Sequence, residues 1–284
     1  MDKAGGMSKH LHNLRVSLDV FQYFVIFMFS VVYVSNGYIF YALTYLELWP
    51  DYTCAASVLK DDCTRELMCN NPGNPELIRV DWGSTRSLHN WVEKLDLVCE
   101  PSWKVGLIGS MYLFGWSAGC LFVPRMGDVY GRRWPYLISM GISLFVYLGL
   151  ILSNNVNLTM ALFFLLGLCT PGKSNIAYVY LLELVPTDWQ TYVGTMLLFA
   201  DGSTMIFLSI YFRYISKDWL WFQIFALSLS AVAFIGTFLA PESPKYLYSY
   251  SRFLEARASL AHIARFNQAD RSQRYIFDEE AKEE

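Results

Sequence analysis

Six long apolar runs constrain the fold of this chain more than any other feature. They cover roughly residues 19–46, 104–124, 135–153, 158–184, 190–213 and 219–240. A helix that crosses a bilayer needs about 20 mainly apolar residues, so each run is long enough to cross once. The chain is 54% hydrophobic, whereas soluble domains contain about 45–50% apolar residues and do not concentrate them in long runs. We therefore predict an all-α, multi-pass membrane protein with a bundle of six transmembrane helices.

The segments outside the apolar runs divide the chain into parts. We expect an N-terminal segment at 1–18, the bundle at 19–240 with a polar insert at about 48–102, and a tail at 241–284. Lysine and arginine favour the inside of a membrane, so we place the termini inside and the insert outside. The basic residues behind this orientation are Lys3, Lys9, Arg15, Arg125, Arg132, Arg133, Lys245, Arg252 and Arg257, against Arg213 and Lys217 outside.

The tail and the insert each carry a further pattern. In the tail, apolar residues at helical spacing predict an amphipathic helix on the inner face, followed by a solvated acidic end, "DEEAKEE". The insert contains four cysteines, namely Cys54, Cys63, Cys69 and Cys99. We expect two disulfides in an oxidising compartment, and the sequence leaves all three pairings open.

Charge and histidine placement exclude several classes of function. A net charge of −3 argues against nucleic acid as a partner, because nucleic-acid-binding domains are usually basic. The histidines, His10, His12, His89 and His262, lie in soluble segments without the spacing of metal ligands. No set of residues suggests catalysis, so we predict no enzyme, no cofactor and no metal. The lipid bilayer is the one partner that these features require.

Two charged residues lie deep in predicted membrane helices. Lys173 precedes Val185 by 12 residues and Asp201 follows Gln190 by 11, which places both about 16–18 Å from the inner surface. An ionisable group at this depth is costly, and a very short turn joins the two helices. We therefore predict a Lys173–Asp201 ion pair at the midplane. It is either a binding or proton-coupling site or a structural pair, and Asn36 in the first helix is a further cavity candidate.

Glycine, proline and aromatic residues predict local features of the helices. Gly115 and Gly119 form a G-x-x-x-G pattern, which permits close helix contact. Pro124 is expected to kink or end the second helix. Pro171 and Gly172 either loosen the fourth helix and expose its carbonyl groups to a cavity or form a packing kink. We expect most aromatic residues of the first helix to pack or face lipid; they include Phe24, Phe29, Tyr33, Tyr38, Phe40, Tyr41 and Tyr45.

Several segments resemble the organic cation and anion transporters of the major facilitator superfamily. They are "WPDYTC", "KLDLVCEPSWKVGLIGSMYLFGWSAG", "GDVYGRR", "KDWLWFQ", "PESPKYL" and "EARASLAHIARFN", in order from about residue 45 to 267. Members of that family have twelve helices in two halves, and this chain resembles the N-terminal half. The resemblance implies alternating access, in which one bundle rocks against the other around a midplane site, and a small organic ion as cargo.

The turn between the second and third helices resembles the family's cytoplasmic latch between bundles. Six residues match the positions that the resemblance implies: Asp128, Gly131, Arg132, Arg133, Glu183 and Glu242. Pro124 and Val129 depart from the pattern, where the family has a glycine and a basic residue. An ordinary positive-inside loop with a turn glycine would explain Gly131, Arg132 and Arg133 equally well.

The family usually has a basic residue at four positions where this chain has none. The residues present are Val129, Phe163, Gln190 and Leu220. These replacements, and the match to one half, favour a non-transporting accessory or structural subunit of a larger membrane assembly. The alternative is half of a working carrier that pairs with a second half. The resemblance implies the plasma membrane, but the insert lacks an N-glycosylation site, so an organelle membrane such as the mitochondrial inner membrane stays open.

Overall fold

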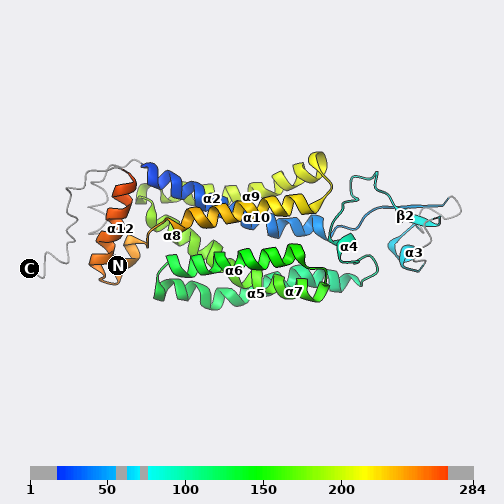
Figure 1. Cartoon of the computed structure of the whole chain (residues 1–284), viewed down its shortest axis with the longest axis horizontal. Coiled ribbons are helices and arrows are strands. Elements are labelled where there is room, and N and C mark those ends of the chain that lie inside the picture. Colours follow the sequence, from blue (N-terminus) through cyan, green and yellow to red (C-terminus); the bar gives the residue numbers. More distant parts are fainter. Residues whose placement is uncertain (1–17, 56–62, 71–75, 268–284) are drawn as a thin grey trace, which may run out of the picture.

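The computed structural model describes residues 18–55, 63–70 and 76–267 of this chain. The basic N-terminal residues Lys3, Lys9 and Arg15, and the acidic end at 278–284, therefore lie outside the described residues. Figure 1 shows an elongated molecule, with a helical bundle in the middle, the insert at one end and the C-terminal helices at the other. Following the predicted orientation, we call the end with the insert the outer end and the opposite end the inner end.

Six helices are long and apolar enough to cross a membrane, as predicted. Those with uninterrupted α-helical geometry are α2 (Val20–Leu46), α5 (Ser102–Tyr130), α6 (Arg133–Leu152) and α10 (Trp219–Phe238). The fourth span runs from α7 (Val156–Pro171) through a π-helical turn, η2 (Gly172–Ile176), into α8 (Ala177–Leu184). The fifth span consists of η3 (Thr187–Trp189), α9 (Gln190–Ile210) and a second π-helical turn, η4 (Tyr211–Ile215).

Pro124 in the second span and Pro171 in the fourth span have different effects on their helices. Pro124 does not end its helix, because α5 continues through it to Tyr130. A proline removes a single backbone donor, and neighbouring helices in a membrane bundle compensate for that loss. For Pro171 the sequence left open a loosened helix or a packing kink, and in the structure a π-helical turn begins at the next residue.

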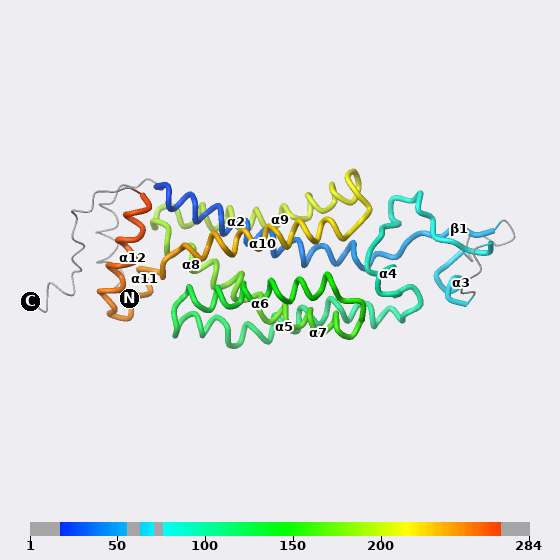
Figure 2. The backbone as a smooth tube through the Cα atoms, in the orientation of Figure 1, coloured from blue at the N-terminus to red at the C-terminus, as the bar shows by residue number. Residues whose placement is uncertain are grey.

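The spans form two groups, which Figure 2 shows as an upper and a lower row. Helix α2 packs against α9 and α10, and α7 packs against α5 and α6. Helices α5 and α7 approach each other closely: a methyl group on Gly115 would overlap the carbonyl oxygen of Phe164, and one on Gly119 would lie 2.6 Å from that of Leu168. The G-x-x-x-G pattern therefore serves packing within the bundle, because only glycine lets these two backbones approach so closely.

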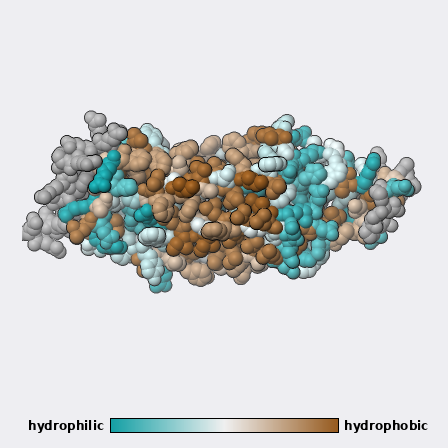
Figure 3. All heavy atoms as spheres, viewed as in Figure 1, coloured by the Kyte–Doolittle hydropathy of each residue, from teal (hydrophilic) through white to brown (hydrophobic). Residues whose placement is uncertain are grey.

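The apolar surface of the bundle is placed for contact with lipid. Large apolar side chains are exposed on all six spans, for example Phe114 on α5 and Phe199 on α9. Figure 3 shows the hydrophobic side chains gathered in the middle of the molecule, with hydrophilic ones at both ends. A belt of this kind matches the hydrocarbon layer of a bilayer. The chain is an integral multi-pass membrane protein.

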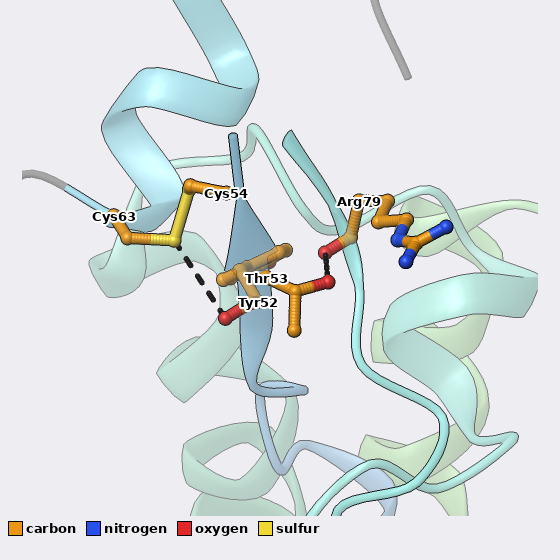
Figure 4. The surroundings of a disulfide bond; sticks show 5 residues. All are labelled: Tyr52, Thr53, Cys54, Cys63 and Arg79. Atoms are coloured by element: carbon orange, nitrogen blue, oxygen red, sulfur yellow. Dashed lines mark hydrogen bonds between the residues drawn. A yellow bond between two sulfur atoms is a disulfide. The ribbon is translucent and has the colours of Figure 1, made fainter. Parts of the chain in front are cut away.

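The outside insert is a small disulfide-bonded unit. Strands β1 (Tyr52–Cys54) and β2 (Ile78–Val80) pair antiparallel, and a short helix, α3 (Arg65–Asn70), follows β1 along the chain. The two expected disulfides are present, and their pairing is Cys54–Cys63 and Cys69–Cys99. Figure 4 shows the first of them beside β1, with the Thr53 hydroxyl directed at the carbonyl oxygen of Arg79 on β2.

Polar side chains fasten the insert to the outer ends of the spans. Asn90, just before α4 (Trp91–Lys94), donates from its amide to the carbonyl oxygens of Tyr45 and Leu48 at 2.8 Å. Lys94 donates to the Ile151 carbonyl oxygen at 2.7 Å. Lys217 donates to two insert carbonyl groups, those of Trp82 and Ser84. Cations and amides thus satisfy carbonyl groups at helix C-termini and in the insert.

The tail forms two helices across the inner end of the bundle. They are α11 (Pro244–Ser249) and α12 (Phe253–Phe266), and the second is the predicted amphipathic helix. The Phe266 ring lies 5.5 Å from the rings of Phe21 and Phe24 at the start of α2. Asn267 accepts a hydrogen bond from the Phe21 amide at 2.8 Å. The tail is therefore packed against the bundle.

Candidate functional site

The inner turn between α5 and α6 depends on one glycine. Gly131 has φ 101° and ψ 169°, a conformation that is almost restricted to glycine. A side chain at this position would also meet the carboxylate of Glu242. The sequence pattern of a turn glycine is therefore explained by backbone geometry and by the close approach of an acidic group.

Glu242 receives the backbone of that turn. Its Oε1 accepts from the amides of Arg132 at 2.9 Å, Arg133 at 3.2 Å and Ser243 at 3.0 Å. The Arg132 and Arg133 amides lie at the start of α6, where helical N–H groups have no partner within the helix. A carboxylate there satisfies these donors and interacts favourably with the helix dipole.

Arg132 joins three helices at the inner end. Its guanidinium group contacts Asp128 of α5 at 2.5 Å and Glu183 of α8 at 3.3 Å. Burial disfavours the charge on Arg132, but the two carboxylates outweigh burial and raise the pKa of the guanidinium group. Arg132 is therefore a permanent positive charge that links α5 and α8.

Further groups from α10 and the tail complete the inner turn. Arg133 donates to the carbonyl oxygen of Phe238 at 3.0 Å, at the end of α10. The hydroxyl groups of Tyr246 and Tyr250 donate to the carbonyl oxygens of Val129 and Asp128, at the end of α5. Neither tyrosine is among the site residues predicted from the sequence. The available signal was the "PESPKYL" segment of the family resemblance, which contains Tyr246 and ends three residues before Tyr250.

The structure brings all six predicted latch residues together, and we call this set the inner-turn network. It comprises Asp128, Gly131, Arg132, Arg133, Glu183 and Glu242. Its contacts join α5, α6, α8 and the segment after α10 within this one bundle. A role as a latch against a second bundle stays a prediction.

The predicted ion pair at the midplane is wrong. Among the described residues, no salt bridge involves Lys173 or Asp201. The fourth and fifth spans meet near their short turn, where Tyr178 contacts Gly194. At the level of Lys173, however, the π-helical turn packs against α5, α6 and α2. A short connection thus fixes two helices as neighbours at one end and does not keep them together at mid-membrane.

The two charges have different surroundings. Lys173 is 3% exposed and lies one turn after Cys169. The Asp201 carboxylate accepts a hydrogen bond from the Tyr41 hydroxyl of α2 at 3.1 Å. Gly37 of α2 makes this approach possible, because a methyl group there would lie 3.1 Å from Asp201 Oδ1. Asp201 therefore belongs to the face between α2 and α9.

Polar side chains of α2 and α5 extend this region toward the fourth span. The Tyr33 hydroxyl donates to the carbonyl oxygen of Ser174, in the π-helical turn, at 2.7 Å. Thr170 donates to the Tyr112 hydroxyl of α5 at 3.0 Å, and Asn36 interacts with the same hydroxyl. We call this set the polar cluster: Tyr33, Asn36, Tyr41, Tyr112, Thr170, Ser174 and Asp201. Tyr33 and Tyr41 were expected to pack or face lipid, and instead they make polar contacts.

At two of the four positions that lack the family's basic residue, the residue present makes contacts within this bundle. Phe163 is 1% exposed and packs its ring against Trp91 and Tyr112. Gln190 donates to the carbonyl oxygen of Leu182 at 2.6 Å, near the end of α8. Gln190 thus satisfies a helix C-terminus, which a cation would otherwise favour.

The bundle and its lipid-facing belt define a multi-pass membrane protein, and comparison with known proteins gives its family. A family model described as "Sugar (and other) transporter" matches residues 20–284. The chain belongs to this transporter family, in the organic cation and anion transporter group of the major facilitator superfamily.

Named relatives place the chain more closely. It is 30% identical over 190 residues to an organic cation transporter-like protein of Drosophila melanogaster, covering 66% of this chain and 33% of the relative. It is 28% identical over 177 residues to solute carrier family 22 member 2 of Rattus norvegicus, covering 62% and 32%. It is 27% identical over 180 residues to organic cation/carnitine transporter 2 of Homo sapiens, also covering 62% and 32%. The matched part is thus about a third of each relative.

Proposed function

We propose that this chain forms the N-terminal half of an organic-ion carrier that works by alternating access, with Lys173 and the polar cluster as part of its ion site. One relative is named an organic cation transporter-like protein and another an organic cation/carnitine transporter, so we infer a transport role rather than an enzymatic one. In such carriers the substrate site lies near the bilayer midplane, between two bundles. The second bundle would be either another chain or a second copy of this one.

The observation that carries the proposal is that Lys173 and Asp201 do not neutralise each other. A structural role for two costly intramembrane charges would require mutual pairing. Instead, Asp201 bonds to Tyr41, and Lys173 is buried without a carboxylate partner among the described residues. Charges kept at this depth without pairing favour a ligand or a proton as the partner.

A second candidate is a non-transporting accessory subunit of a larger membrane assembly. It is favoured by the four positions that lack the family's basic residue. Phe163, in the core, is the strongest of them, because an arginine there would have to bury its charge among aromatic rings. Replacements that improve packing within one bundle suit a protein that no longer cycles.

Uptake separates the two candidates. The full chain is expressed in cells with low background uptake, and entry of a fluorescent styrylpyridinium cation and of carboxyfluorescein is measured. We expect uptake of one probe, and a fall of at least about tenfold in Lys173→Gln and Asp201→Asn. Each variant removes a charge proposed to bind the transported ion or a proton, and a hydrogen bond to a charged group is worth about 1.5–3 kcal/mol. The matched control is Arg79→Gln, an exposed change in the insert.

Native-gel migration and thermal stability complete the experiment. Uptake lost in a variant that keeps its thermal stability supports the carrier. A wild-type chain that gives no uptake of either probe would exclude a carrier built from copies of this chain alone, and its migration within a large complex would then favour the accessory subunit.

A further inference from the structure

The outer end of the bundle contains a cavity that neither the inner-turn network nor the polar cluster uses. Its volume is about 460 Å³, and it lies between the outer ends of α2 and of the fifth span and the insert residues 85–88. Sites for small organic molecules usually measure about 300–1,000 Å³ and have mainly apolar walls. Tyr45 and Phe212 form such a wall, because their rings stack at 4.8 Å.

Two arginines line this cavity from different elements. Arg213 comes from η4 and Arg86 from the insert. The side chain of Arg213 has no acidic partner and no hydrogen bond among the described residues. Arg86 reaches Asp51 only at 3.9 Å, while the other carboxylate oxygen of Asp51 accepts from Ser84 at 2.5 Å. Both guanidinium groups therefore keep donors that can bind a ligand.

Hydroxyl groups lie beside these cations. The side chains of Thr85 and Ser209 line the cavity, and the Ser209 hydroxyl lies 2.8 Å from that of Tyr45. Hydroxyl groups both donate and accept, so they can add hydrogen bonds to an anion held by the arginines.

The neighbouring cation Lys217 has a structural role that Arg213 lacks. Lys217 is occupied by the carbonyl groups of Trp82 and Ser84, and so holds the insert to the bundle. Arg213 has no such structural contact, although arginine is depleted on the outer side of membrane proteins. A ligand contact would explain why a cation stands at this position.

We propose that this cavity binds amphipathic organic anions: a carboxylate, sulfonate or phosphate group held by Arg86 and Arg213, and an apolar body against Tyr45 and Phe212. A planar guanidinium group can bind such an anion through two parallel hydrogen bonds. A ligand cation would be repelled by both arginines, which outweighs attraction to the aromatic wall. The site is at the outer surface, and its occupation does not depend on transport.

Either a free organic acid or the headgroup of an anionic lipid in the outer leaflet could supply this chemistry. For the free acid, the full chain is placed in phosphatidylcholine nanodiscs and titrated with pyrenebutyrate, followed by pyrene fluorescence. For the lipid, native mass spectrometry counts phosphatidylglycerol retained by the protein. The variants are Arg86→Gln and Arg213→Gln, and the matched control is Arg79→Gln, which lies in the same insert but does not line the cavity.

We expect each variant to weaken binding about tenfold, equivalent to about 1.4 kcal/mol, while Arg79→Gln binds like the wild type. Higher salt should also weaken binding, because the two cations are near solvent. A loss confined to pyrenebutyrate assigns the site to free acids, and one confined to phosphatidylglycerol assigns it to lipid. Unchanged binding of both probes in both variants overturns the proposal. So does neutral pyrenebutanol that binds as tightly as pyrenebutyrate.

Discussion

Gly131 offers the sharpest test of the inner-turn network. Its backbone conformation, φ 101° and ψ 169°, costs about 1–3 kcal/mol for any other residue. In Gly131→Ala the new methyl group must also displace the Glu242 carboxylate. That displacement weakens at least one charge-assisted hydrogen bond to the start of α6, worth about 1.5–3 kcal/mol. We therefore expect a loss of about 3–5 kcal/mol in the free energy of unfolding.

Thermal unfolding in detergent, followed by tryptophan fluorescence, measures this loss. For a chain of this size, 1 kcal/mol corresponds to about 2–4 °C, so the melting temperature should fall by about 6–20 °C. The control is Gly106→Ala in α5, where an added methyl group has no neighbour within 4 Å. Glu242→Gln keeps the shape of the acceptor but loses its charge, and should cost less than Gly131→Ala. Equal melting temperatures for Gly131→Ala and Gly106→Ala would refute the role given to this turn.

Two further substitutions should change the free energy of unfolding in opposite directions: Glu47→Gln should raise it and Gly167→Ala should lower it. Glu47 follows α2 with a buried oxygen that has no hydrogen-bond partner among the described residues, and burial raises its pKa from 4.5 to about 7. The wild type should therefore lose stability as pH rises from 4.5 to about 7. Glu47→Gln should remove that loss. At pH 8 the variant should be about 1–2 kcal/mol more stable than the wild type, after allowance for solvent screening. Chemical unfolding of both proteins across this pH range measures the difference, and parallel pH profiles would contradict the prediction. Gly167→Ala should cost about 1–3 kcal/mol, because its methyl group would overlap the Tyr112 carbonyl oxygen and force α7 away from α5. Its melting temperature, compared with that of Gly106→Ala, checks this, and equal values would count against the close contact.

The sequence by itself determined the architecture of this protein. Six apolar runs of sufficient length require six membrane helices, because a bilayer leaves no other way to satisfy their backbone groups. The cysteines predicted two disulfides, and the glycine pattern of α5 predicted a close helix contact. The residues of the inner-turn network were also found from the sequence, through the resemblance of their segments to motifs of the transporter family.

Tertiary structure alone decided which distant groups meet. Equal depth and a short connecting turn suggested that Lys173 would pair with Asp201, but the π-helical turn directs this part of the fourth span toward α5, α6 and α2. Asp201 of α9 instead faces α2, where the Tyr41 hydroxyl is its partner. Depth along a helix can be counted from the sequence. The direction of a side chain around the helix axis depends on local turns and on neighbouring helices, and so does the pairing of charges.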